Sequence, residues 1–165
     1  MKFAESELKQ ITAETWKILL GEELQHLSGP LLPSQMDNPL AACAQIVGDW
    51  QLGVIIYCPM ALARHAAATM LGIDQEQVST ADVHDVLREL INIVAGNVKG
   101  LLSGANLLSL PKIVKGSDFQ PRFVRQVELG EACFTSQSMP LLVRLLGEDR
   151  PAPAKTTPGI VQRGQ

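Results

Sequence analysis

The sequence has few of the residues that mark a secreted, metal-binding or nucleic-acid-binding protein. Its three cysteines, Cys43, Cys58 and Cys133, form no CxxC or CxxH pair, which argues against a disulfide framework and a zinc knuckle. The chain has 14 Lys and Arg residues against 17 Asp and Glu residues, and no basic run. Without a basic stripe to displace the counterions of a phosphate backbone, binding to nucleic acid is not expected.

A long apolar run is also absent. The longest uncharged stretch, residues 50–63, contains Pro59 and is shorter than the roughly 20 residues that a membrane-spanning helix needs. The N-terminus, MKFAESELKQ, is charged and has no apolar core, so no signal peptide is expected. We therefore expect a cytoplasmic protein with no membrane partner and with reduced cysteines.

Length and hydrophobic content favour one domain. The 165 residues are 46% hydrophobic, which is sufficient for a single core. We expect this domain to span residues 1–147. The remaining residues, 148–165, are rich in proline and poor in large apolar side chains, so a disordered tail is predicted there.

Hydrophobic periodicity indicates an α+β fold. The first predicted helix places Ile18 on its apolar stripe and is expected to end at Gly29 and Pro30. Helices are predicted over residues 5–27, 60–71 and 80–103. Strands are predicted over residues 41–47 and 52–58, which form a hairpin, and over residues 107–114, 122–129, 132–136 and 141–146.

The long helix, which begins near Thr80, carries the most information. A step of 100° per residue places six residues within an arc of about 80°, opposite the apolar face. They are Asp85, Glu89, Asn92, Gly96, Lys99 and Ser103. Gly96 costs about 1 kcal/mol relative to alanine there, so it either lets another protein approach beside Asn92 or packs against a neighbouring element. Asn97 lies nearer the apolar arc, and we expect its amide to be hydrogen-bonded inside the fold.

Glu89 and Asn92 project side by side from this helix. A carboxamide in that position can orient an attacking water, as the glutamine of a GTPase does, while the carboxylate holds a cation of the partner. By itself Glu-x-x-Asn is a weak motif, because most such pairs are simply part of a solvated helix face.

The sequence around the pair is more specific. HDVLRELINIVAGNVKGLLSG is similar to the signature helix of the CheC/CheX/FliY family of chemotaxis phosphatases, whose Asp/Ser, Glu and Asn positions are matched by Asp85, Glu89 and Asn92. The resemblance covers residues 5–147 and includes the expected hairpin, the alanine-rich helix and the strand with Pro111. The family has a longer spacing from Asn to Pro than this chain has. Either the connection after the helix is shorter here, or Pro111 is not the equivalent proline.

The resemblance implies a fold, a substrate and a mechanism. The fold would be an antiparallel sheet with long amphipathic helices packed on one face. A single motif fits a CheX-like homodimer that acts on the aspartyl phosphate of a CheY-like response regulator, with Mg²⁺ held by the regulator and no cofactor bound by this chain. Asn92 would position water and Glu89 would pair with a regulator lysine, while Asp85, Gly96 and Lys99 would contact the partner. The alternative is a non-catalytic dimeric module that binds a response regulator or another signalling protein.

Other candidate residues give weaker signals. His26, His65 and His84 have no metal-ligand spacing, so we interpret them as surface or boundary residues. Cys58 precedes a predicted helix, where the helix dipole can lower the pKa of a thiol; a buried cysteine at a strand end is the preferred interpretation. Trp50, in the hairpin turn, either contacts a partner or folds back on its own sheet, and we favour the second.

Overall fold

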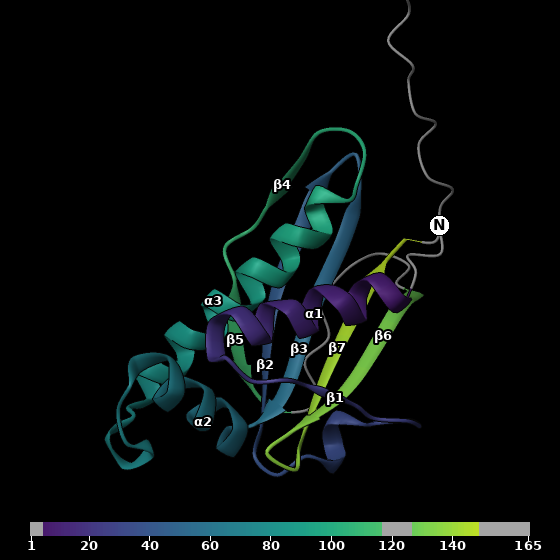
Figure 1. The fold of residues 1–165 in the computed structure, drawn as a ribbon. Coiled ribbons are helices and arrows are strands. Elements are labelled where there is room, and N and C mark those ends of the chain that lie inside the picture. The colour runs from purple at the N-terminus through teal and green to yellow at the C-terminus, as the bar shows by residue number, and fades with distance from the viewer. Residues whose placement is uncertain (1–4, 117–126, 149–165) are drawn as a thin grey trace, which may run out of the picture.

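The computed structural model describes residues 5–116 and 127–148 and shows one layer of helices on an antiparallel sheet (Figure 1). The sheet has seven strands in the order β1-β6-β7-β3-β2-β4, and β5 also pairs with β2. The strands are β1 (Gln25–His26), β2 (Pro39–Gly48), β3 (Gln51–Pro59), β4 (Asn106–Leu108), β5 (Lys112–Lys115), β6 (Val127–Ser136) and β7 (Met139–Gly147). The helices are α1 (Glu5–Leu20), α2 (Met60–Leu71) and α3 (Thr80–Gly100), with short 3₁₀ turns η1 (Pro33–Gln35) and η2 (Gln75–Gln77).

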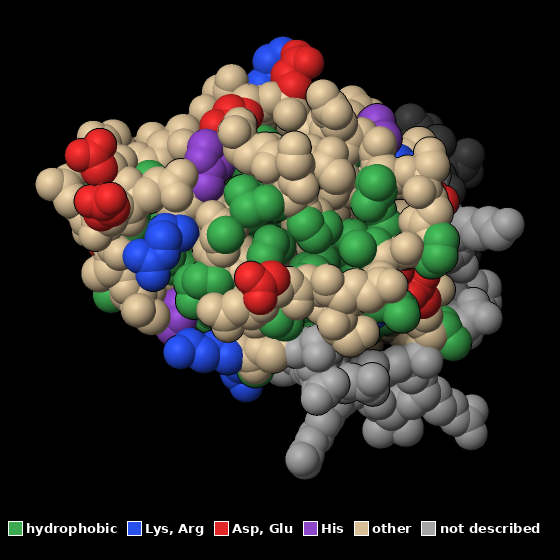
Figure 2. All heavy atoms as spheres, turned by 90° about the horizontal axis from the view of Figure 1, so that it is seen from below, with side chains coloured by type: hydrophobic (Ala, Val, Ile, Leu, Met, Phe, Trp, Pro, Cys, Tyr) green, Lys and Arg blue, Asp and Glu red, His purple; other side chains and the backbone are tan. Residues whose placement is uncertain are grey.

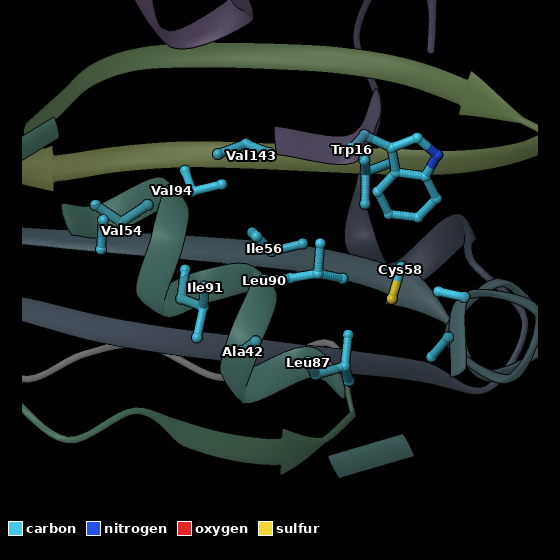
Figure 3. Packing of buried hydrophobic residues seen from close by; sticks show 14 of the residues in the cluster. Trp16, Ala42, Val54, Ile56, Cys58, Leu87, Leu90, Ile91, Val94 and Val143 are labelled. Atoms are coloured by element: carbon cyan, nitrogen blue, oxygen red, sulfur yellow. The ribbon is translucent and has the colours of Figure 1, made fainter. Parts of the chain in front are cut away.

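Helices α1 and α3 cover one face of the sheet, as predicted, and α2 packs against α3 at one end of the sheet (Figure 1). In Figure 1, α1 crosses in front of β7 and β6, while α3 runs along the side of the sheet that carries β2 and β4. The core between the layers is apolar. Figure 3 shows Leu87, Leu90 and Val94 of α3 directed toward side chains of the sheet such as Ile56 and Val143. Burial of these side chains is the main force that holds the helices on the sheet.

A second, smaller cluster covers the opposite face of the sheet. Leu31 and Met36, from the segment around η1, pack there against Cys43, Tyr57 and other strand residues. Figure 2 views the molecule from below Figure 1, toward an end of the sheet and not onto this face, and shows apolar side chains gathered into a patch with charged side chains around it. Because both faces contribute to cores, β2 and β3 are apolar along almost their whole length.

The predicted hairpin and second helix are confirmed. β2 and β3 pair antiparallel, with Val47 opposite Gln51 at the turn. Trp50 in this turn is only 2% exposed, so it folds back on its own domain as we favoured. Helix α2 ends at Gly72, whose φ of 65° is the left-handed conformation that glycine adopts most readily at a helix end.

The first helix differs from the prediction. It ends at Leu20 and not near Gly29, because Gly21, with φ 70°, terminates it. Its buried stripe contains Leu8, Thr12, Thr15, Trp16 and Leu20. Ile18 is 81% exposed, so its predicted place on the apolar stripe is wrong.

The later strands differ mainly in their boundaries. The predicted strand over residues 107–114 is divided into β4 and β5 by Pro111. The predicted strands over residues 122–129 and 132–136 share one described strand, β6, which has an irregular register between Glu128 and Gly130. Residues 122–126, and the predicted tail from residue 149 onward, lie outside the described residues. No helix in the described ranges is both long and apolar enough to cross a membrane.

Candidate functional site

Helix α3 carries the candidate site, and its sequence explains where it starts. Ser79 caps the helix: its Oγ accepts a hydrogen bond from Asp82 N at 3.1 Å, and Ser79 N donates to Asp82 Oδ2 at 3.0 Å. This reciprocal pair satisfies backbone N–H groups that have no partner within the helix. The helix therefore begins at Thr80, one residue after its cap, and is oriented by a face of eight buried residues. They are Val83, Val86, Leu87, Leu90, Ile91, Val94, Ala95 and Val98.

Glu89 and Asn92 lie on the exposed side of α3. They are three residues apart, which separates them by about 4.5 Å along the helix axis. Both side chains are exposed, and neither has a hydrogen-bond or ion-pair partner within the described residues. A carboxylate and a carboxamide are thus presented together to whatever contacts this face, and no internal interaction has to be broken first.

Asp85 is different, because it already has a partner. Its Oδ1 accepts a hydrogen bond from Arg88 Nη1 at 3.2 Å, and both side chains are well exposed. Such a pair contributes little to stability. Asp85 would have to exchange Arg88 for a group of the partner, which makes it a weaker contact candidate than Glu89.

The structure excludes one of the two interpretations of Gly96, packing against a neighbouring element, and leaves the approach of a partner as a prediction. Apart from the nearby backbone of its own helix and its chain neighbours, a Cβ atom at this residue would meet no described atom within 4 Å, so Gly96 is not required for packing inside the domain. It leaves a patch of bare backbone next to Asn92. Lys99 is half-buried on the same face, whereas Ser103 lies beyond the end of α3 and does not continue the row.

The prediction for Asn97 is wrong. Its side chain is exposed and has no hydrogen bond within the described part of the chain. The reason is the position of α1, which leaves a groove of about 180 Å³ between α1 and α3. The groove is lined by Ile11, Glu14, Thr15, Ile18, Leu19, Ile93 and Asn97. Sequence reasoning missed it, although the i, i+4 spacing of Leu8, Thr12, Trp16 and Leu20 could have placed Ile18 on the opposite side of α1.

The end of α3 is attached to the tip of the β2–β3 hairpin. Asp49 Oδ2 accepts a hydrogen bond from Ala105 N at 2.8 Å, and Trp50 N donates to Asn106 Oδ1 at 3.0 Å. Gly104, with φ 86°, has Asp49 so close that a Cβ atom would collide with it. The reciprocal pair of Ser79 and Asp82 therefore fixes the start of α3, and the β2–β3 hairpin fixes its end.

The remaining candidate residues do not form a second reactive site. All three cysteines are free and buried, as expected. Cys58 is buried at the end of β3, as the preferred interpretation predicts, and burial raises the pKa of its thiol to about 12, which is opposite to what a reactive thiol needs. His65 Nε2 lies 2.7 Å from Glu22 Oε1 and links α2 to the segment after α1. Within the described ranges, no group of three or more His, Cys, Asp or Glu side chains could hold a metal ion.

The chain is similar in fold to several solved chemotaxis proteins. The chemotaxis protein CheX from Vibrio vulnificus is 19% identical, with a TM-score of 0.67 over 87% of this chain and 95% of that one. A CheC-like superfamily protein from a Shewanella species is 18% identical, with a TM-score of 0.68 over 87% and 96%. The CheX–CheY–BeF₃–Mg²⁺ complex from Borrelia burgdorferi gives 14% identity and a TM-score of 0.68 over 90% and 100%. The fold is that of the CheX and CheC-like proteins.

A family model identifies the family itself. The model described as "Chemotaxis phosphatase CheX" matches residues 40–135, more than half of the chain, and the match includes Glu89 and Asn92. The chain belongs to the CheX family of chemotaxis phosphatases. No curated protein matches the sequence.

Proposed function

We propose that this chain hydrolyses the aspartyl phosphate of a CheY-like response regulator. The observation that carries the proposal is the pair of exposed side chains, Glu89 and Asn92, that α3 presents without internal partners. Membership of the CheX family and the likeness to a CheX bound to CheY support the choice of substrate.

In this proposal, Asn92 is the catalytic residue. Its carboxamide has an N–H donor and a carbonyl acceptor, so it can hold a water molecule in line with the phosphorus–oxygen bond that breaks. The water oxygen bonds to phosphorus, the bond to the regulator's aspartate breaks, and inorganic phosphate and a free carboxylate result. Mg²⁺ belongs to the regulator and supplies electrostatic stabilisation of the phosphoryl group.

Glu89 holds the complex in register. Its carboxylate would pair with a lysine of the regulator, which fixes the position of Asn92 relative to the phosphoryl group. Gly96 allows close approach of the two backbones, Lys99 contacts the partner further along the helix, and Asp85 contributes at the periphery. We also propose that residues 1–147 form one domain and that the chain is a homodimer; light scattering that gives the mass of one chain, 17.9 kDa, would refute the dimer.

The test is the decay rate of a phosphorylated CheY-like regulator from the same cell, with Mg²⁺ present. The wild-type chain should accelerate the decay, and Asn92→Ala should abolish most of the acceleration while the regulator still binds. Gln77→Ala is the matched control, because Gln77 is an exposed carboxamide in η2, away from the α3 row. Equal acceleration by wild type and Asn92→Ala would refute the catalytic role. Binding without acceleration would favour the non-catalytic interaction module.

A further inference from the structure

The groove between α1 and α3 lies directly beside the proposed catalytic row. On α3, Ile93 follows Glu89 by four residues, which is about 6 Å along the same side of the helix, and Asn97 follows Ile93 by another turn. Both line the groove, and α1 supplies the other wall. A partner that covers Glu89 therefore reaches the groove without crossing any other element.

The groove exposes apolar surface that the domain does not use. Ile11 and Leu19 are half-buried and pack on the core, but Ile18 is 81% exposed at the edge of the groove. Burial of one isoleucine side chain in a complex strengthens binding by roughly tenfold or more. Ile18 and Ile93 together thus offer an apolar site for one side chain of a partner.

The lining of the groove includes one acidic side chain. Glu14 lines it and is exposed, with Oε1 accepting a hydrogen bond from Gln10 Nε2 at 3.0 Å. The neighbouring cation on α1, Lys17, forms its ion pair with Glu23 at 3.2 Å. Glu14 on α1 and Glu89 on α3 therefore favour a partner surface that carries positive charge.

The α3 row is too small to hold a protein partner by itself. From Asp85 to Lys99 it is about 21 Å long and, at a helix width of about 10 Å, offers on the order of 200 Å². A stable protein complex buries about 800 Å² on each partner. A regulator bound at Asn92 must therefore cover neighbouring elements as well.

We propose that the α1–α3 groove is the second half of the docking surface for the response regulator. Ile18 and Ile93 receive an apolar side chain of the regulator, and Glu14 attracts a basic side chain next to it. The inference rests on the proposed function, since it takes the same partner, but it assigns binding to α1 residues outside the Glu-x-x-Asn motif. These residues act on affinity and not on the chemical step.

The experiment measures the affinity of the full chain for a CheY-like regulator activated with beryllofluoride, a mimic of the phosphoryl group, and Mg²⁺. Ile18→Ser should weaken binding roughly tenfold, and serine has a helix propensity close to that of isoleucine. Glu14→Lys should weaken binding several-fold, and the loss should shrink as salt is added. In the decay assay both variants should raise KM and leave kcat near the wild-type value.

Two matched controls lie away from the groove. Leu71→Ser changes an exposed leucine at the end of α2, and Glu76→Lys changes an exposed acid in η2. Both should bind the regulator like the wild type, and thermal unfolding of every variant checks that the domain is intact.

Several outcomes would overturn the docking inference. Unchanged affinity in Ile18→Ser and Glu14→Lys refutes it even if Asn92→Ala shows that catalysis occurs. Unchanged regulator binding together with a lower mass for Ile18→Ser in light scattering assigns the groove to a second copy of this chain. Weaker binding by the groove variants, with no acceleration by the wild type, supports the groove and refutes the catalytic proposal. A wild-type chain that binds no activated regulator overturns both proposals.

Discussion

Replacement of Gly96 by alanine should make the domain more stable and the proposed complex weaker. Glycine in the interior of a helix costs about 1 kcal/mol relative to alanine. The added Cβ atom would meet no described atom within 4 Å beyond the nearby backbone of its own helix and its chain neighbours, so no packing penalty offsets the gain. We therefore expect the free energy of unfolding to rise by about 1 kcal/mol, which raises Tm by about 2–4 °C in a chain of this size.

The expected effect on binding has the opposite sign. If the regulator's backbone approaches Gly96 beside Asn92, the methyl group of alanine in Gly96→Ala holds the regulator away from α3. Overpacking at a close contact costs about 1–3 kcal/mol, so the affinity for the activated regulator should fall by about tenfold or more. A gain in stability with a loss of binding would show that glycine is retained for the partner and not for the fold.

Two measurements check this reasoning, and one variant controls it. Thermal or denaturant unfolding gives the stability, and titration of the beryllofluoride-activated regulator gives the affinity. Thr69→Ala also raises helix propensity, but at an exposed residue of α2 outside the α3 row, and it should leave binding unchanged. A destabilised Gly96→Ala would refute the open position of Gly96. A stabilised variant with wild-type affinity would refute its role in docking.

Two further predictions concern stability. Burial raises the pKa of the Cys58 thiol from the ordinary value of 9.0 to about 12; above pH 9 the unfolded chain releases this proton more easily, so stability falls as pH rises toward 12. At pH 10 the free energy of unfolding should be lower by about 1.4 kcal/mol than at neutral pH. Urea unfolding at pH 8 and pH 10 measures this decrease, which should be smaller in Cys58→Ala than in the wild type. An equal decrease in the two proteins would contradict the prediction. Ser79→Ala removes the cap of α3 and should lower the free energy of unfolding by about 1 kcal/mol in the same assay. Thr80→Ala, which changes an exposed residue outside the capping pair, is the control. Equal effects of the two substitutions would contradict the role of the cap.

The elements that the sequence predicts well have strong local signals. The β2–β3 hairpin and α2 are bounded by Gly48, Pro59 and Gly72, where the backbone requirement is local. The exposed row of α3 follows from a helical period sustained over 21 residues. These features depend little on contacts with distant parts of the chain. Hydrophobic periodicity and the residues at the ends of each element are therefore sufficient to predict them.

The failures come from contacts between distant elements. The positions predicted for Ile18 and Asn97 rest on the periodicity of a single helix, whereas their exposure depends on how α1 and α3 lie beside each other on the sheet. The end of α1 was misplaced because apolar residues after Gly21 continue an approximate period. The continuity of β6 depends on pairing with β7 through an irregular register, which single-sequence patterns do not reveal.

The positions of the three thiols allow opening of the domain to be measured separately on the two faces of the sheet. Cys58 lies in the core beneath the helices, whereas Cys43 and Cys133 belong to the cluster on the opposite face of the sheet. A thiol reagent can reach Cys58 only when the helix layer separates from the sheet. Cys43 needs only the segment around η1 to move away, whereas Cys133 lines a groove with His26, Leu27 and Glu131. Labelling rates of variants that keep one cysteine each would therefore compare the opening free energies of the two sides of a single sheet.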